Sequence, residues 1–91
     1  MEKLRAKIDI TDSKILELLG NRMKVAEEIG AIKKAKNVSV LQNKRWAEIL
    51  EKMVADGEDK GLSEEFILKL FKAIHQESIS HQEKIMNHSS N

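Results

Sequence analysis

The fold of this chain is decided by residues 2–36, EKLRAKIDITDSKILELLGNRMKVAEEIGAIKKAK, a stretch that contains no proline. Apolar residues return along it at alternating intervals of four and three residues, the spacing of a helix that packs through one continuous seam. The seam positions are Leu4, Ile8, Thr11, Ile15, Leu18, Arg22, Val25, Ile29 and Ile32. Leu19 and Ala26 widen the apolar stripe. The stretch therefore predicts one long amphipathic helix.

This helix is too long for one copy of the chain to cover. At ~1.5 Å per residue it would extend roughly 50 Å. A compact globule of 91 residues has a radius of gyration of only about 12 Å. A second copy is the simplest cover for the exposed part of the seam, and two-fold dimers are the commonest oligomers. We therefore expect a homodimer.

The rest of the chain predicts two shorter helices. A break over 37–39 follows the first helix, where Asn37 can adopt the left-handed conformation that often ends a helix. A second helix is expected from about 41 or 42 to 56–57, followed by a charged loop over 57–62. Ser63 is a good N-cap for a third helix that ends near 86. We expect one all-α domain of three helices over 1–86 and a flexible tail over 87–91.

The composition argues against several classes of partner. The net charge is only +1, whereas a DNA-binding domain usually has a strongly basic face. The chain has one tryptophan, two phenylalanines and no tyrosine, which are few for stacking on single-stranded nucleic acid. It has no cysteine, no apolar run of membrane-spanning length and no visible signal peptide. We expect a cytoplasmic protein that binds neither nucleic acid nor membrane.

Polar residues interrupt the apolar faces of the predicted helices. Arg22 occupies a seam position, and Lys33 lies three turns along nearly the same face. Ser78 and Gln82 continue the apolar stripe of the third helix, and Arg45 lies near the start of the second. Taken singly, each has an ordinary explanation, such as a surface ion pair, a solvated charge or a fraying stripe. Taken together, they predict a pocket for a small polyanion, since guanidinium groups suit carboxylates.

Residues for other kinds of chemistry are not evident in the sequence. It shows no carboxylate pair, no activated serine and no metal-ligand spacing, so we expect neither a metal nor a cofactor. His75, His81 and His88 do not share one face at i, i+4 spacing, and we expect them at the surface. Trp46 is expected in the core. An enzyme built in this way would act by positioning and electrostatics.

The sequence resembles a known family at this point. The resemblance lies in Leu4-Arg5-x-x-Ile8-Asp9-x-x-Asp12-x-x-Ile15-Leu16-x-Leu18-Leu19-x-x-Arg22, continued by Val25-Ala26-x-x-Ile29-Gly30-x-x-Lys33. Arg45 at the start of the second helix and Glu77-Ser78-x-x-x-Gln82 on the third complete it. Over nearly its whole length the chain resembles the all-helical chorismate mutases. The resemblance implies a protomer whose long first helix is entwined with that of a partner, with two active sites per dimer.

The resemblance also implies a reaction and substrate contacts. The reaction is the pericyclic rearrangement of chorismate to prephenate, a step towards phenylalanine and tyrosine, without a covalent intermediate. Arg22, Arg45 and the partner's Arg5 would bind the substrate carboxylates. Lys33 and Gln82 would hydrogen-bond the ether oxygen, where negative charge develops as its bond breaks.

Helix geometry supports a site shared between two chains. Arg5 and Arg22 are separated by roughly 25 Å of helix, so they cannot reach one small ligand from the same chain. An antiparallel two-fold partner would bring its own Arg5 near Arg22.

The sequence departs from the family pattern on the second helix. Many members carry acidic residues three positions before and one position after the second-helix arginine, where this chain has Gln42 and Trp46. The acidic residue after the arginine usually helps to hold the substrate hydroxyl. Gln42 can hydrogen-bond a hydroxyl, whereas Trp46 can do so only as an indole donor. On the third helix, the resemblance implies that Ser78 would help to fix the orientation of the substrate.

Three other interpretations remain open at the level of sequence. The chain is also compatible with a non-catalytic helical dimerisation or regulatory module, although this explains the seam better than the polar residues. A second possibility is a lyase on the same fold that removes pyruvate from isochorismate, which would also need a dicarboxylate pocket. A third is that the domain belongs to a larger shikimate-pathway enzyme.

Overall fold

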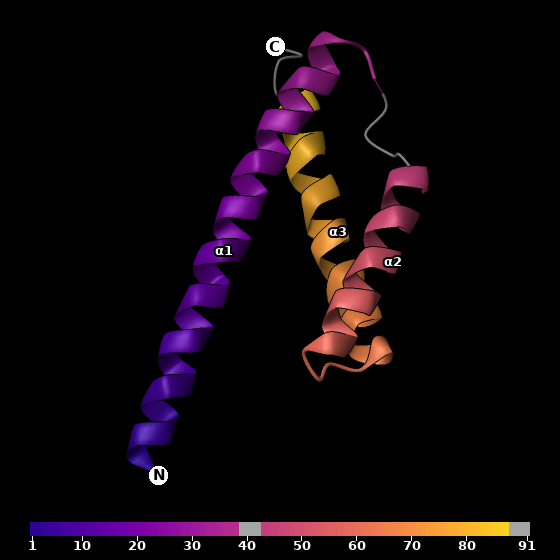
Figure 1. Ribbon diagram of the computed structural model, residues 1–91. Coiled ribbons are helices and arrows are strands. Elements are labelled where there is room, and N and C mark those ends of the chain that lie inside the picture. The colour runs from indigo at the N-terminus through magenta and orange to yellow at the C-terminus, as the bar shows by residue number, and fades with distance from the viewer. Residues whose placement is uncertain (39–42, 88–91) are drawn as a thin grey trace.

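Within the residues that the structure describes, the chain forms three α-helices. The computed structural model describes residues 1–38 and 43–87. The helices are α1 (Glu2–Ala35), α2 (Asn43–Asp59) and α3 (Glu64–Asn87) (Figure 1). This confirms the predicted all-α class and the long first helix. Of the tail predicted over 87–91, Asn87 instead belongs to the last turn of α3, and residues 88–91 lie outside the described residues.

The end of α1 has the geometry that the sequence predicts. Asn37 has a positive φ of 56°. Its amide donates to the carbonyl of Lys34 at 3.2 Å, and the Val38 amide donates to that of Lys33 at 2.8 Å. These two bonds form a Schellman motif, which satisfies carbonyls that the helix end would leave unpaired. The motif ends α1 and turns the chain out of its axis.

The corner between α2 and α3 lies later in the chain than predicted. Gly57, expected to begin a loop, is buried inside α2 instead. A Cβ there would lie 2.8 Å from Cγ1 of Ile67, so the side chain of Ile67 packs directly against this glycine. The turn itself contains Gly61 at a φ of 78°, a left-handed conformation that suits glycine. Ser63 then caps α3 as predicted, its hydroxyl accepting from the Phe66 amide at 3.2 Å.

The third helix holds the domain together, because both other helices pack against it. The most buried apolar side chains are Ile67 and Ile74 on α3 and Ala26 on α1. The N-terminal half of α1 projects away from α2 and α3 (Figure 1). The radius of gyration of 16.1 Å and the longest extent of 53 Å exceed those of a compact globule of this size. The elongated shape is a direct consequence of the projecting helix.

The face of α1 that packs against α3 is not the predicted seam. Its least exposed positions include Leu19, Met23, Ala26 and Gly30, one place further along the chain than the seam. The large apolar residues of the seam remain exposed, from Leu18 at 66% to Ile29 at 41%. Within one chain, therefore, α1 presents two apolar stripes, of which α3 covers one.

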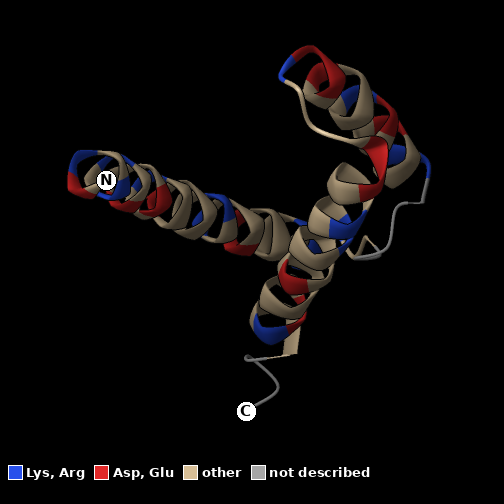
Figure 2. Cartoon of the chain, turned by 90° about the horizontal axis from the view of Figure 1, so that it is seen from below, with Lys and Arg blue, Asp and Glu red and all other residues tan. Residues whose placement is uncertain are grey.

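Acidic and basic residues are interspersed along all three helices (Figure 2). This distribution matches the near-zero net charge. None of the three described helices has the length and apolarity needed to cross a membrane.

The close approach of α1 to α3 at Gly30 leads to a stability prediction. A Cβ at Gly30 would lie 3.0 Å from Cα of Gln82 and 3.1 Å from its carbonyl oxygen, both backbone atoms that move only with the helix. We expect Gly30→Ala to lower the free energy of unfolding by about 1–3 kcal/mol, the usual effect of overpacking a core. Thermal unfolding followed by circular dichroism measures this change.

Gly20 provides the matched control on the same helix. No atom lies within 4 Å of a Cβ built there, and the position is exposed. Gly20→Ala should therefore stabilise the protein by roughly 0.5–1 kcal/mol through helix propensity alone. If both substitutions shifted the melting temperature equally, the contact between Gly30 and Gln82 would not constrain the packing of α1 on α3.

Candidate active site

All three helices contribute to a cavity of about 340 Å³. Its polar lining comes from α1, α2 and α3, with apolar walls between. The lining residues are Arg22, Val25, Ala26, Ile29, Lys33, Arg45, Trp46, Ile49, His75, Ser78, Ile79 and Gln82. The cavity is large enough for a small organic anion.

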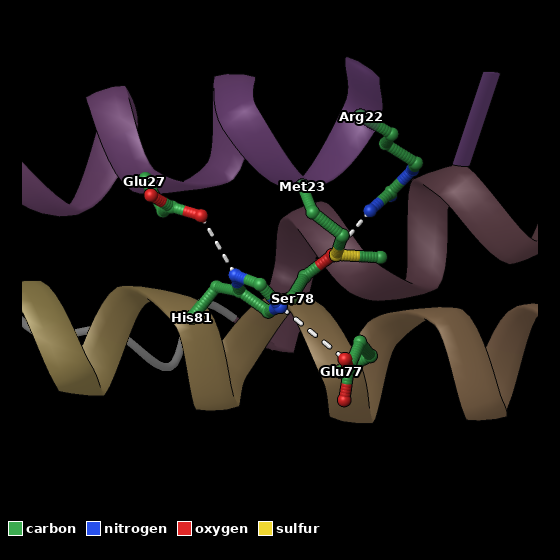
Figure 3. A network of polar contacts seen from close by, with 6 residues as sticks. All are labelled: Arg22, Met23, Glu27, Glu77, Ser78 and His81. Atoms are coloured by element: carbon green, nitrogen blue, oxygen red, sulfur yellow. Dashed lines mark hydrogen bonds and ion pairs between the residues drawn. The ribbon is translucent and has the colours of Figure 1, made fainter. Parts of the chain in front are cut away.

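Arg22 and Ser78 meet on the α1 side of the cavity. The Arg22 guanidinium donates a short hydrogen bond to the Ser78 hydroxyl, which in turn contacts the Met23 sulfur at 3.8 Å (Figure 3). Ser78 is only 5% exposed, so the apolar stripe of α3 does not fray at this position. Burial lowers the pKa of Arg22, although a guanidinium stays protonated at neutral pH. The contact fixes a cation at the cavity wall.

Lys33 and Gln82 form a second pair, about three turns of α1 beyond the first. The Lys33 ammonium donates to Oε1 of Gln82 at 3.0 Å. Gln82 is 8% exposed, and burial lowers the pKa of Lys33. Because the amide oxygen faces the ammonium, the amide NH₂ group remains as a second donor of Gln82. The pair therefore supplies a cation and a neutral donor from two different helices.

The remaining predicted site residues differ in position. Arg45 lines the cavity with a side chain that is 69% exposed and lies 4.0 Å from Glu48. Arg5 is exposed on the projecting part of α1 and is not among the lining residues. Gln42 lies outside the described residues. One chain thus brings together five of the seven predicted residues.

Trp46 and His75 form a stacked pair in the cavity wall. Their ring centroids are 3.9 Å apart and the rings are inclined by 9°. The predicted surface position of His75 holds only in part, because the side chain is half-buried and lines the cavity, three residues before Ser78 on the same helical face. Burial, together with the cations of Arg22 and Lys33, lowers the pKa of His75. The spacing of i and i+3 to Ser78 was the sequence signal that could have identified this residue.

His81 lies outside the cavity and links α1 to α3. Its Nδ1 is 2.8 Å from Glu27 and its Nε2 is 3.2 Å from Glu77 (Figure 3). The hydrogen bond to Glu27 raises the pKa of His81, and Glu77 adds to this rise while burial opposes it. The side chain is 25% exposed, so its predicted surface position holds in part. His88 lies outside the described residues.

The raised pKa of His81 predicts a pH-dependent contribution to stability. The folded protein holds this proton more tightly than the unfolded chain, so the contribution is fully present below the unfolded pKa of ~6.5. It is lost as the pH rises through the folded pKa. We expect the melting temperature of wild type to exceed that of His81→Gln by more at about pH 6 than at about pH 9.

Glu27 supplies the control for this prediction. Glu27→Gln removes the main acceptor of His81 and should show the same pH dependence. When the melting temperature of each variant is compared with that of wild type at the same pH, the contributions of all other titrating groups cancel. A constant difference between wild type and His81→Gln across this range would contradict a charged link between α1 and α3.

Comparison with known families decides the affiliation of the chain. A family model described as chorismate mutase type II matches residues 4–83, nearly the whole chain. The chain belongs to this family. The match includes every residue that lines the cavity.

Similar proteins carry the chorismate mutase domain within a longer polypeptide. The chain is 31% identical over 88 residues to the bifunctional chorismate mutase/prephenate dehydratase of Escherichia coli K12, covering 97% of this chain and 23% of that protein. It is 30% identical over 82 residues to the protein of the same name from Buchnera aphidicola of Acyrthosiphon pisum, covering 90% and 21%. The chain therefore spans less than a quarter of the length of these relatives.

The electrostatics of the cavity favour an anionic ligand. Among the described residues, its lining includes Arg22, Lys33 and Arg45 and has no acidic side chain. Such an arrangement can bind carboxylates and can stabilise negative charge that develops on a bound molecule. These interactions need neither a nucleophile nor a proton transfer from the protein.

Proposed function

We propose that this chain rearranges chorismate to prephenate in its cavity, as part of the biosynthesis of phenylalanine and tyrosine. The observation that carries the proposal is the convergence of Arg22, Lys33, Arg45, Ser78 and Gln82 on one cavity. These residues come from three helices and are far apart in the sequence. The family membership of residues 4–83 supports the same conclusion.

The proposed mechanism relies on positioning and on electrostatic stabilisation. Arg22 and Arg45 bind the two carboxylates of the substrate, and Ser78, held by Arg22, fixes its orientation. In the transition state the bond to the ether oxygen breaks and negative charge grows there. Lys33 and Gln82 donate hydrogen bonds to that oxygen, so their interaction is stronger in the transition state than with bound substrate.

We propose further that two copies form a dimer through the exposed seam of α1. Leu4, Ile8, Ile15 and Leu18 are each at least 49% exposed in one chain, along the part of the helix that projects. A continuous apolar stripe of this length marks an interaction surface. An antiparallel partner laid along it would bring its own Arg5 towards Arg22, and this fourth cation would complete the cavity.

The dimer predicts a result in solution. Sedimentation equilibrium at micromolar concentration should give twice the mass of 10.4 kDa. Burying the seam in both copies removes apolar surface from water, which is favourable by about 25 cal/mol per Å². Leu18→Glu should shift the equilibrium towards monomer because it places a charge in the buried seam. A folded wild-type monomer at this concentration would exclude the shared cavity.

The loss of chorismate absorbance, together with identification of the product, tests the proposed reaction. We expect prephenate to accumulate as chorismate disappears, without any added metal or cofactor. Release of pyruvate from isochorismate would instead indicate lyase activity on the same fold. A dimer that binds and converts neither compound would be a helical dimerisation module.

A further inference from the structure

The stacked pair of His75 and Trp46 has no role in the mechanism proposed above, although both rings line the cavity. His75 shares one face of α3 with Ser78 and Gln82, at intervals of three and seven residues. It therefore faces the same ligand as the residues already assigned to substrate binding. An imidazole at such a position can contribute either a donor or an acceptor.

Chorismate presents more than carboxylates to a binding site. Its ring carries a hydroxyl, which donates one hydrogen bond and therefore needs an acceptor. The three cations of the cavity, Arg22, Lys33 and Arg45, have only donors, and the indole of Trp46 is also only a donor. Among the described residues, the side-chain acceptors of the lining are Ser78, Gln82 and His75.

Two of these three acceptors are already engaged by the protein. The Ser78 hydroxyl accepts from Arg22 and contacts the Met23 sulfur. Oε1 of Gln82 accepts from Lys33. Among the described residues, neither ring nitrogen of His75 has a hydrogen-bond partner. The imidazole instead stacks on the indole of Trp46.

The surroundings of His75 preserve its ability to accept. Burial and the cations of Arg22 and Lys33 lower the pKa of His75, which keeps the imidazole neutral at neutral pH. A neutral imidazole has one nitrogen with a free lone pair. The indole of Trp46, parallel to the imidazole at 3.9 Å, restricts the ring to one plane and so orients that lone pair.

We propose that His75, positioned by Trp46, accepts a hydrogen bond from the ring hydroxyl of the substrate and selects for substrates that carry it. This inference rests on the proposed chorismate mutase function. It places hydroxyl recognition on α3, whereas the family resemblance implies it on α2, at the position of Trp46. Trp46 acts as a positioning residue, and His75 contacts the substrate.

The test compares chorismate with 4-deoxychorismate, which keeps both carboxylates and the ether but lacks the hydroxyl. The quantity measured is the ratio of kcat/KM for the two compounds, so that differences in their intrinsic reactivity cancel between variants. His75→Leu should lower this ratio about tenfold relative to wild type, because one neutral hydrogen bond is lost only with chorismate. A purely structural role would lower both rates together and leave the ratio unchanged.

Two conservative variants serve as matched controls for the lost acceptor. The side-chain amide of His75→Asn lies near the position of Nδ1, and that of His75→Gln near Nε2. We expect one of the two to keep the wild-type ratio, which would also identify the nitrogen that accepts. Trp46→Phe keeps an aromatic face against the imidazole and should retain most of the ratio, whereas Trp46→Leu should lose part of it.

The outcomes separate this inference from the function on which it rests. If wild type does not convert chorismate, the proposed function fails and the inference fails with it. If wild type converts chorismate and His75→Leu keeps the wild-type ratio, only the inference is overturned. Should His75→Leu fail to fold, Trp46→Leu takes its place, and an unchanged ratio in that variant would overturn the inference equally.

Discussion

Gln82→Glu should be nearly inactive at about pH 8 and should regain activity as the pH falls towards about 5, because an ionised carboxylate only accepts hydrogen bonds. Gln82 is 8% exposed and 3.0 Å from the Lys33 ammonium. An ionised carboxylate there would pair with Lys33 and repel the charge that develops on the ether oxygen. Burial favours the protonated carboxyl of this variant, whereas Lys33 favours the ionised form. Acidification protonates the carboxyl and so restores a hydrogen-bond donor at position 82. The measurement is kcat against pH.

Lys33→Ala tests the other member of the pair. Losing one donor to a developing oxyanion typically costs about 10²–10³ in rate. We expect kcat to fall by that factor with the fold intact, as judged by circular dichroism. Because the contact strengthens in the transition state, KM should change less than kcat.

Matched controls lie on the same helices, outside the cavity. Gln76 on α3 and Lys24 on α1 are exposed. Gln76→Glu should keep the wild-type pH profile, and Lys24→Ala should keep the wild-type kcat. A flat pH profile for Gln82→Glu, or its full activity at about pH 8, would show that Gln82 does not contact the ether oxygen.

The helices themselves could be predicted from local signals. The apolar periodicity of 2–36 predicts α1. Asn37 after the first helix and Ser63 before the third act on neighbouring backbone atoms, and the structure has both as predicted. Gly57 could not be assigned in the same way. Its place inside α2 depends on the side chain of Ile67, which comes from the next helix. From sequence alone, a glycine that ends a helix cannot be distinguished from one that lets a side chain of a neighbouring helix pack closely.

The division of α1 into two faces also depends on tertiary contacts. Periodicity identified an apolar stripe, yet the stripe one residue further along is the one that α3 covers. Spacing alone cannot say which stripe meets a helix of the same chain and which stays exposed. The same limit applies to His75. Its spacing from Ser78 predicts the helical face on which it lies, but not its stacking partner Trp46, which comes from another helix.

Arg22→Ala and Arg5→Ala should each lose most of the proposed chorismate mutase activity, and mixing the two inactive proteins should restore part of it. In the proposed dimer each cavity combines Arg22 of one chain with the partner's Arg5. A mixed dimer then has one cavity with both defects and one with neither. After random exchange half of the dimers are mixed and half of their cavities are intact, which predicts about a quarter of wild-type activity.

A second mixture separates a shared cavity from recovery by any other route. The double variant Arg5→Ala/Arg22→Ala, mixed with an equal amount of wild type, forms mixed dimers in which each cavity has one defect. Activity should then fall from about half of the wild-type value to about a quarter as subunits exchange. If Arg5 instead served the cavity of its own chain, the single variants would stay inactive together and the second mixture would stay at half. In the proposed dimer the exposed seam of α1, beyond the reach of α3, would hold Arg5 at the partner's cavity, since Arg5 is not among the residues that line the cavity of its own chain.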